Sequence, residues 1–202
     1  MVQQLAVKTA EKMSKYGVIE EKSCRIYAYG LELFFSSLAG VVVLIFLSAV
    51  QGNPHSWIPY LAGFVPLRLS GGGYHAKTHF RCIFTFSLLY LLALIIGQSF
   101  PIPAAVWPVI CLINLAIIFL FSPVEASNKP LKVSQSTTNR RKSLFLGVIN
   151  LFGCIASLFL QSAHSQWVNM YFSGSSIAGL SMLLAVINNS NVERRRLHEK
   201  VG

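Results

Sequence analysis

The stretch LELFFSSLAGVVVLIFLSAV, Leu31 to Val50, is twenty residues long and holds one charged side chain, Glu32, near its start. At about 1.5 Å per residue, a helix of this length spans the roughly 30 Å hydrocarbon core of a bilayer. The whole chain has the same character, since 53% of its 202 residues are hydrophobic, 12% are charged and the mean hydropathy is +0.56. Soluble domains carry about 25% charged residues, so this composition predicts an integral membrane protein.

Five further apolar segments follow, separated by short polar stretches. They are residues 57–69, 80–96, 104–121, 144–160 and 167–187. As a helix the first of these is only about 20 Å long, and it holds Pro59 and Pro66, which favour a kink. We therefore predict an all-α integral membrane protein, a bundle of about six transmembrane helices with the second short or kinked. A single membrane domain would cover residues 31–187.

The basic residues indicate the orientation of this bundle. All seventeen lie in residues 1–30, 68–81 and 122–143 and in the tail after Ile187, and the other three turns have none. Because short loops rich in Lys and Arg stay in the cytoplasm, the pattern predicts six crossings with both termini inside. Residues 1–30 would be a cytoplasmic segment, either an interfacial amphipathic helix or a solvated leader, and residues 188–202 a basic cytoplasmic tail. Membrane lipid, and no nucleic acid, is the partner that these charges predict.

The most reactive side chains lie in one polar insert between the second and third apolar segments, RLSGGGYHAKTHFRC, Arg68 to Cys82. The three glycines Gly71 to Gly73 would let the backbone of another chain approach closely, although a flexible hinge has the same composition. If the next helix starts near Thr78, its macrodipole and the nearby basic residues favour a thiolate at Cys82. Cys82 is thus a candidate nucleophile.

Two histidines are available as the base for Cys82. On one continuous helix His75 would share a face with Cys82 but lie about 10 Å away along the axis, so the chain would have to fold back between them. His79 is three residues from Cys82 and would face it on a helix. The HAKTH spacing also suits a helical zinc site, but Ala76 stands where HExxH metalloproteases have their general base. We therefore expect no metal and no other cofactor.

The other three cysteines, Cys24, Cys111 and Cys154, lie far apart and form no CxxC pair. Their pattern predicts neither a disulfide framework nor a zinc finger. Two of them lie inside apolar segments, where cysteine behaves as a small apolar side chain. A catalytic role is therefore expected for Cys82 alone.

The insert resembles the accessory gene regulator B (AgrB-like) family, membrane-embedded cysteine endopeptidases that process quorum-sensing propeptides in Gram-positive bacteria. The resemblance rests on Arg68, Gly73, His75 and Cys82, within the string that contains GGGYHAKT. The later SPVEASNKPL, Ser122 to Leu131, resembles a basic, proline-containing loop of the same family. Together with the length and the repeated apolar segments, the similarity covers nearly the whole chain.

This resemblance implies that Cys82 is the nucleophile and that His75, not His79, is the general base. Arg68 and Gly73 would support the site or bind substrate. The substrate implied is a small AgrD-like propeptide, whose acidic C-terminal tail is released while the rest stays on Cys82 as a thioester. A Cys or Ser of the propeptide would then attack that thioester and close a thiolactone or lactone ring. The site would lie on the cytoplasmic side of the cell membrane, and a homodimer is compatible with the sequence.

A small polytopic transporter or scaffold without catalysis is the alternative, with the glycine loop as a gate and Cys82 as a packing residue. It explains the hydropathy but not the pairing of His75 with Cys82 beside basic residues. The chain has no aspartate, so any acid that orients the histidine must be a glutamate. Glu32 and Glu125 lie on the correct side for this role.

The assignment of His75 makes a structural prediction. The helix that holds Cys82 should begin between these two residues, with a break in helicity between Gly73 and His79. One unbroken helix from Gly73 through Cys82 would instead keep the pair about 10 Å apart, and the dyad within one chain would fail.

Overall fold

The computed structural model describes residues 2–73, 79–99, 103–124, 133–160 and 165–201, without the side chains of residues 79–82, 96–99, 104, 133 and 190–201. The described chain is almost entirely helical. Its α-helices are α1 (Val2–Lys15), α2 (Cys24–Val50), α3 (Trp57–Gly71), α4 (His79–Ser99), α5 (Trp107–Phe121), α6 (Val133–Phe159) and α7 (Gln166–Val201). Short 3-10 turns, Glu21–Ser23 and Ala104–Val106, precede α2 and α5. The predicted all-α architecture is confirmed.

The helices carry large apolar side chains outward and many small polar side chains inward. Phe46 of α2 is 65% exposed and Phe152 of α6 is 68% exposed. The buried polar side chains include those of Ser36, Ser48, Asn114, Ser143, Asn150, Ser175 and Ser181. Soluble proteins seldom expose so much contiguous apolar surface, whereas helices in lipid pack through small and hydrogen-bonding residues. The fold is therefore of the membrane type.

α3 and α7 form the centre of the bundle and approach each other at glycines. A Cβ added to Gly63 of α3 would collide with the carbonyl of Tyr171, and one added to Gly174 of α7 would collide with the carbonyl of Tyr60. Small residues of this kind let the backbones of membrane helices come close. α3 has 15 residues and contains Pro66, so the second apolar segment is short, as predicted. Its central position covers it with protein and makes that length tolerable.

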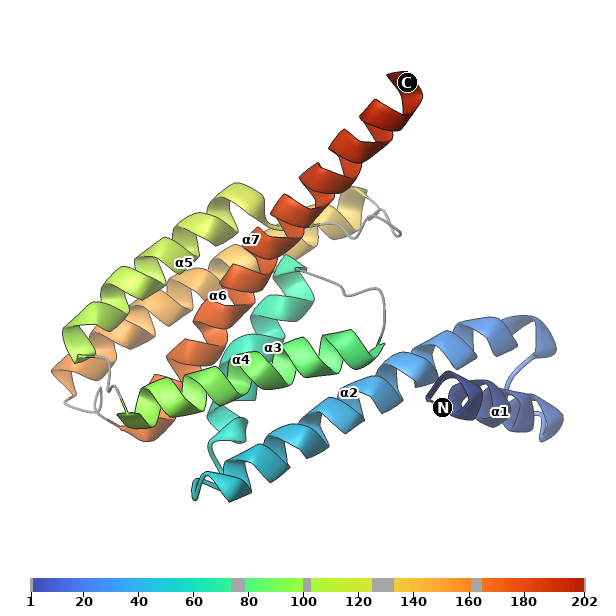
Figure 1. The fold of residues 1–202 in the computed structure, drawn as a ribbon, viewed down its shortest axis with the longest axis horizontal. Coiled ribbons are helices and arrows are strands. Elements are labelled where there is room, and N and C mark those ends of the chain that lie inside the picture. The colour runs from blue at the N-terminus through green and yellow to red at the C-terminus, as the bar shows by residue number, and fades with distance from the viewer. Residues whose placement is uncertain (1, 74–78, 100–102, 125–132, 161–164, 202) are drawn as a thin grey trace.

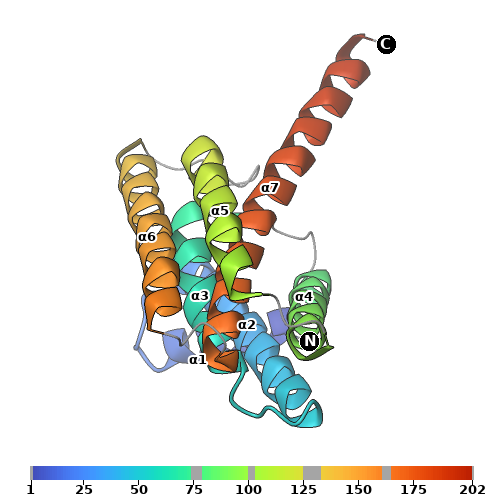
Figure 2. The ribbon, with the colours of Figure 1, turned by 90° about the vertical axis from the view of Figure 1, so that its left-hand side faces the viewer.

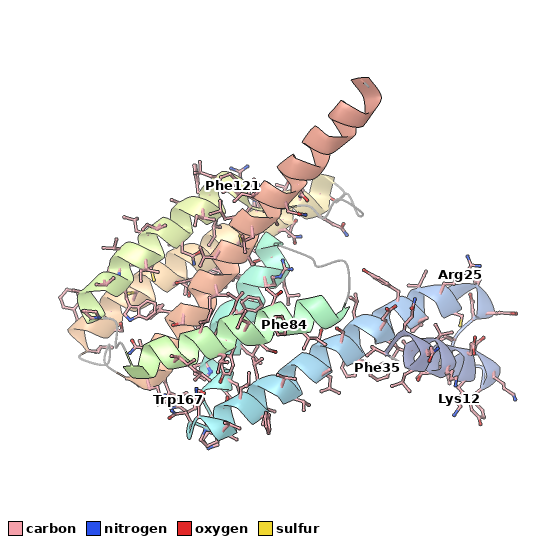
Figure 3. The ribbon with its side chains drawn as sticks, viewed as in Figure 1. Lys12, Arg25, Phe35, Phe84, Phe121 and Trp167 are labelled. Carbon is pink, nitrogen blue, oxygen red and sulfur yellow. The ribbon has the colours of Figure 1, made fainter. Side chains whose placement is uncertain are left out.

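The remaining helices pack on two sides of this central pair. α5 and α6 lie on one side, and α2 and α4 lie on the other (Figures 1 and 2). α1 packs against the first part of α2, with Ala6 and Ala10 buried. Lys12 of α1 and Arg25 of α2 consequently lie at the same end of the molecule (Figure 3). The last turns of α7 project beyond the other helices (Figure 1).

The helices α2 to α7 coincide with the six predicted apolar segments, but three of them extend further. α2 begins at Cys24, α6 begins at Val133 and α7 runs to Val201, so much of the expected polar loop and of the basic tail is helical. Hydropathy marks only the apolar part of a helix, whereas Gln, Lys, Arg and Glu continue a helix readily.

Three described stretches are long and apolar enough to cross a membrane. They are Glu21–Val50, Ser134–Phe159 and Gln166–Asn189, and Ile83–Ile95 and Trp107–Phe121 are shorter apolar helices. The number of crossings and the orientation of the bundle stay predictions.

Candidate active site

Gly72 ends α3 by pairing with a segment that is distant in sequence. It forms a parallel β-bridge with Val124, whose N–H donates a hydrogen bond of 2.9 Å to the carbonyl of Gly71. The φ angle of Gly72 is +77°, and a Cβ there would collide with the carbonyl of Val124. Glycine meets both requirements without strain. Because Val124 belongs to SPVEASNKPL, the two segments that carry the family resemblance contact each other.

The neighbouring glycines face other parts of the bundle. Gly73, with a φ of +142°, lies so close to the guanidinium of Arg68 and the hydroxyl of Ser181 that a Cβ would collide with both. A Cβ on Gly71 would collide with the side chain of Met182 on α7. Each glycine therefore packs against a different neighbour within the chain, and the approach of another chain's backbone stays a prediction.

The structure describes α4 from His79 onward, so Cys82 lies in the first described turn of this helix. The positive φ angles of Gly72 and Gly73 do not occur in a right-handed helix, which excludes one unbroken helix from Gly73 through Cys82. His75 lies outside the described residues, as do the side chains of His79 and Cys82. The first N–H groups of any helix lack intrahelical acceptors and form the positive end of its dipole. The backbone of Cys82 thus lies where an anionic sulfur or oxygen is stabilised.

Two of the other cysteines are packing residues. Cys111 and Cys154 are buried in one cluster with Trp107 and Phe172, as their place inside apolar segments predicts. In the part of the chain that the structure describes, no group of three or more His, Cys, Asp or Glu side chains could hold a metal ion. The zinc alternative rests on histidine side chains outside this part.

A cavity of about 290 Å³ lies between α2, α3, α4 and α7, beside the first turns of α4. Its lining includes Ile83, the residue after Cys82, and Arg68 of the last turn of α3. Ser36 of α2 and Ser181 of α7 add hydroxyl groups, and most of the other lining residues are apolar. Arg68, a residue singled out by the family resemblance, therefore lines a cavity that adjoins the proposed nucleophile.

The sequence analysis missed a set of buried hydrogen bonds that join α5, α6 and α7. The amide of Asn114 donates to the carbonyl and hydroxyl of Ser175 at 3.1 and 3.2 Å, and the amide of Asn150 donates to the same hydroxyl at 2.9 Å. The hydroxyl of Tyr171 donates to the side-chain carbonyl of Asn150 at 2.5 Å. An asparagine in the middle of an apolar segment is the signal that predicts such a partner.

The sequence model of the family described as Accessory gene regulator B matches residues 6–187. The chain belongs to the accessory gene regulator B family. It is also similar to AgrB-like protein 2 of Clostridium perfringens (strain 13 / Type A), with 25% identity over 194 residues that cover 91% of this chain and 85% of that protein. No solved structure matches the chain. Membership of the family supports a role in accessory gene regulator quorum sensing, at the processing of a propeptide.

Proposed function

We propose that this chain is a membrane cysteine endopeptidase that removes the C-terminal tail of a small AgrD-like propeptide, with Cys82 as nucleophile and His75 as general base. The position of Cys82 in the first turn of α4, after a non-helical backbone at Gly72 and Gly73, is the observation that carries the proposal. A helix N-terminus favours a thiolate. The end of α3 before His75 also allows the chain to turn back towards Cys82, which a continuous helix would prevent.

The reaction is nucleophilic acyl transfer. His75 takes the proton of the Cys82 thiol as the sulfur bonds to the carbonyl carbon of the scissile peptide bond. The C–N bond then breaks, the leaving amine of the tail receives the proton from His75, and the remaining propeptide stays on Cys82 as a thioester. A thiol or hydroxyl of the propeptide next attacks this thioester. Its proton returns to the Cys82 sulfur through His75, and a thiolactone or lactone ring closes.

The surroundings of Cys82 suit both steps of this reaction. N–H groups of the first turn of α4 are natural donors to the oxyanion of the tetrahedral intermediate, because they lack intrahelical acceptors. The apolar stretch Ile83–Ile95 follows directly. A dry environment slows hydrolysis of the thioester and favours the internal attack that closes the ring.

The bridge between Gly72 and Val124 supports a role for Glu125. Gly72 precedes His75 by three residues, and Val124 directly precedes Glu125. The segments that contain His75 and Glu125 therefore both start at the same end of α3. We favour Glu125 over Glu32 as the acid that orients His75.

We further propose a multi-pass orientation in which the Cys82 end of the bundle faces the cytoplasm. Lys12 and Arg25 lie together at one end of the molecule (Figure 3), and all seventeen basic residues fall in the segments predicted to be cytoplasmic. Such a face follows the positive-inside rule. It would also attract the acidic tail of the propeptide.

The direct test is to incubate an AgrD-like propeptide with the purified chain in lipid vesicles. Cys82→Ala should abolish cleavage while the protein still inserts and folds, because the attacking sulfur is gone. Cys24→Ala, in the same chain, is the matched control and should keep wild-type cleavage. Mass spectrometry of the wild-type reaction should find the shortened propeptide attached to the peptide that contains Cys82. Cleavage by Cys82→Ala at the wild-type rate would refute the assignment.

The cysteine and zinc mechanisms predict opposite effects of iodoacetamide and EDTA on cleavage. Iodoacetamide should inactivate the Cys24→Ala protein by alkylating Cys82, and EDTA should leave it active. Loss of activity in EDTA that zinc restores would move the assignment to a metalloprotease that uses His75 and His79.

A further inference from the structure

The cavity between α2, α3, α4 and α7 is polar at one end and apolar at the other. Arg68 and Ser36 line it at the end of the bundle where α4 begins and Cys82 lies. Leu61 of α3 and Leu89 of α4 line the opposite end. These leucines lie about two helical turns, or roughly 10 Å, from the polar end. The cavity therefore has polar groups beside the proposed nucleophile and an apolar far end.

The helices that border this cavity are joined at its apolar end. α2 and α4, which carry the labelled Phe35 and Phe84, run side by side (Figure 3). Tyr90, the residue after Leu89, hydrogen-bonds to the hydroxyl of Ser48 on α2 and, at 2.8 Å, to the hydroxyl of Ser56. The apolar end is thus held by fixed contacts.

One large apolar side chain of a peptide suits these dimensions better than a lipid chain does. Ligand pockets measure about 300–1,000 Å³, and this cavity, at about 290 Å³, is at the lower limit. A lipid chain runs through one leaflet, about 15 Å or half of the hydrocarbon core, and is longer than the roughly 10 Å between the two ends of the cavity. A peptide also suits the polar groups of the lining, because the guanidinium of Arg68 and the hydroxyl of Ser36 can donate hydrogen bonds to its carbonyl groups.

We propose that the cavity binds the apolar side chain of the propeptide residue whose carbonyl carbon Cys82 attacks, and that it selects a large apolar residue at that position. The inference rests on the proposed function and adds the specificity of the same site. Ile83 lines the cavity and directly follows Cys82 in the chain. The backbone of Cys82 therefore lies at the edge of the cavity.

Gly40→Leu is the substitution that fills the cavity. Gly40 of α2 lies in the cavity wall, and a Cβ there would meet only Phe86 within 4 Å, at 3.9 Å, so the added side chain extends into the space without displacing backbone. Gly153→Leu on α6 is the matched control, because a Cβ there would meet nothing within 4 Å and the position is outside the cavity lining. Both variants place leucine in a helix that had glycine.

The substrates for this test are propeptides with Phe or Ala before the scissile bond. The wild type and Gly153→Leu should cleave the Phe form with a kcat/KM about ten- to a hundredfold above that of the Ala form. Gly40→Leu should lose most of this preference, because it slows cleavage of the Phe form and leaves the Ala form near the wild-type rate. An equal loss on both substrates, or no change on either, would overturn the proposal.

Leu61→Ala provides a second variant that does not depend on the folding of Gly40→Leu. It enlarges the apolar end of the cavity, and it should raise the preference for Trp over Phe at the same substrate position. An unchanged ratio of Trp to Phe cleavage would count against the cavity as the specificity site.

A binding measurement separates this inference from the proposed reaction. The Cys82→Ala variant, in phospholipid vesicles, is irradiated with a propeptide that carries a benzophenone residue before the scissile bond. Crosslinks should fall on residues 36–41 of α2 or 83–89 of α4, and crosslinks confined to α5 or α6 would overturn the assignment. A photoreactive phospholipid is crosslinked in the same way with and without the propeptide. If it labels residues 36–41 equally in both cases, the cavity binds lipid and the proposal is overturned. Failure of the wild type to cleave any propeptide would count against the proposed reaction. The crosslink would still test whether the propeptide residue before the scissile bond binds in the cavity.

Discussion

The two sides of the central α3–α7 pair are built differently. Gly63 and Gly174 bring the backbones of the central pair together. On the side of α5 and α6, asparagine, serine and tyrosine side chains hydrogen-bond across three helices. On the side of α2 and α4, the helices enclose a cavity that adjoins the turn containing Cys82. Hydrogen bonds between helices stabilise the first side, whereas the space in the second adjoins the proposed nucleophile.

This difference divides the bundle into a scaffold, formed by α5 and α6 with the central pair, and a working face, formed by α2 and α4 beside the proposed active site. Arg68, Gly72 and Gly73 lie where the two meet, since they sit at the end of the central helix α3 and contact α7 and the segment after α5. Substitutions on the side of α5 and α6 should therefore lower stability, and substitutions near α4 should lower turnover. Four predictions test this division.

The largest effect is expected for His75→Ala, which removes the proposed general base. Its kcat/KM for propeptide cleavage should fall about a thousandfold, equivalent to about 4 kcal/mol, with the unfolding midpoint in detergent unchanged. His79→Ala is the control and should retain most of the activity. If His79→Ala shows the larger loss, the helix neighbour of Cys82 is the base and the fold-back of His75 is wrong.

Gly174→Val should have the largest effect on the scaffold. A Cβ at this position would collide with the carbonyl of Tyr60 on α3, so α3 and α7 must separate, at a cost of about 3 kcal/mol. The measurement is the free energy of unfolding in mixed micelles. Gly153→Val, on the open surface of α6, should change it little, and equal stability of the two variants would contradict the close contact of α3 with α7.

Gly72→Ala should affect both properties, because Gly72 lies where scaffold and working face meet. Its φ of +77° and ψ of −155° lie in a region that essentially only glycine occupies, which costs an alanine about 1–3 kcal/mol, and the added Cβ also displaces the carbonyl of Val124. Gly52→Ala is a close control, since Gly52 has a φ of +74° and an open surrounding. Cleavage should fall about tenfold for Gly72→Ala and stay normal for Gly52→Ala. Equal behaviour of the two would show that the bridge to Val124 does not position the site.

Asn150→Leu should have the smallest effect. It removes hydrogen bonds to Ser175 and Tyr171, and a hydrogen bond between membrane helices contributes about 0.6 kcal/mol on average. We expect the free energy of unfolding to fall by about 1 kcal/mol with kcat/KM unchanged. A large loss of cleavage without loss of stability would place this network in the reaction and not in the scaffold.

Much of the fold could be predicted from local sequence. The apolar segments from Leu31 onward fall on α2 to α7, because about twenty apolar residues can satisfy their backbone groups in lipid only as a helix. The ends of α2, α6 and α7 were less predictable, because polar residues continue a helix without a signal in the hydropathy. Around Cys82 the predicted start of the helix falls among residues 74–78, outside the described residues, and the roles of His75 and Cys82 stay predictions.

The sequence by itself determined that this is an all-α membrane-type chain and that one glycine-rich insert holds the reactive side chains, since both follow from residues close together along the chain. The tertiary structure alone decided that Gly72 pairs with Val124, that Gly63 and Gly174 join α3 to α7, and that Arg68 lines a cavity with Ser36 and Ser181. Each of these contacts joins residues from different helices or loops. They depend on how side chains of several helices interlock at once, and no local pattern of hydropathy or spacing contains that information.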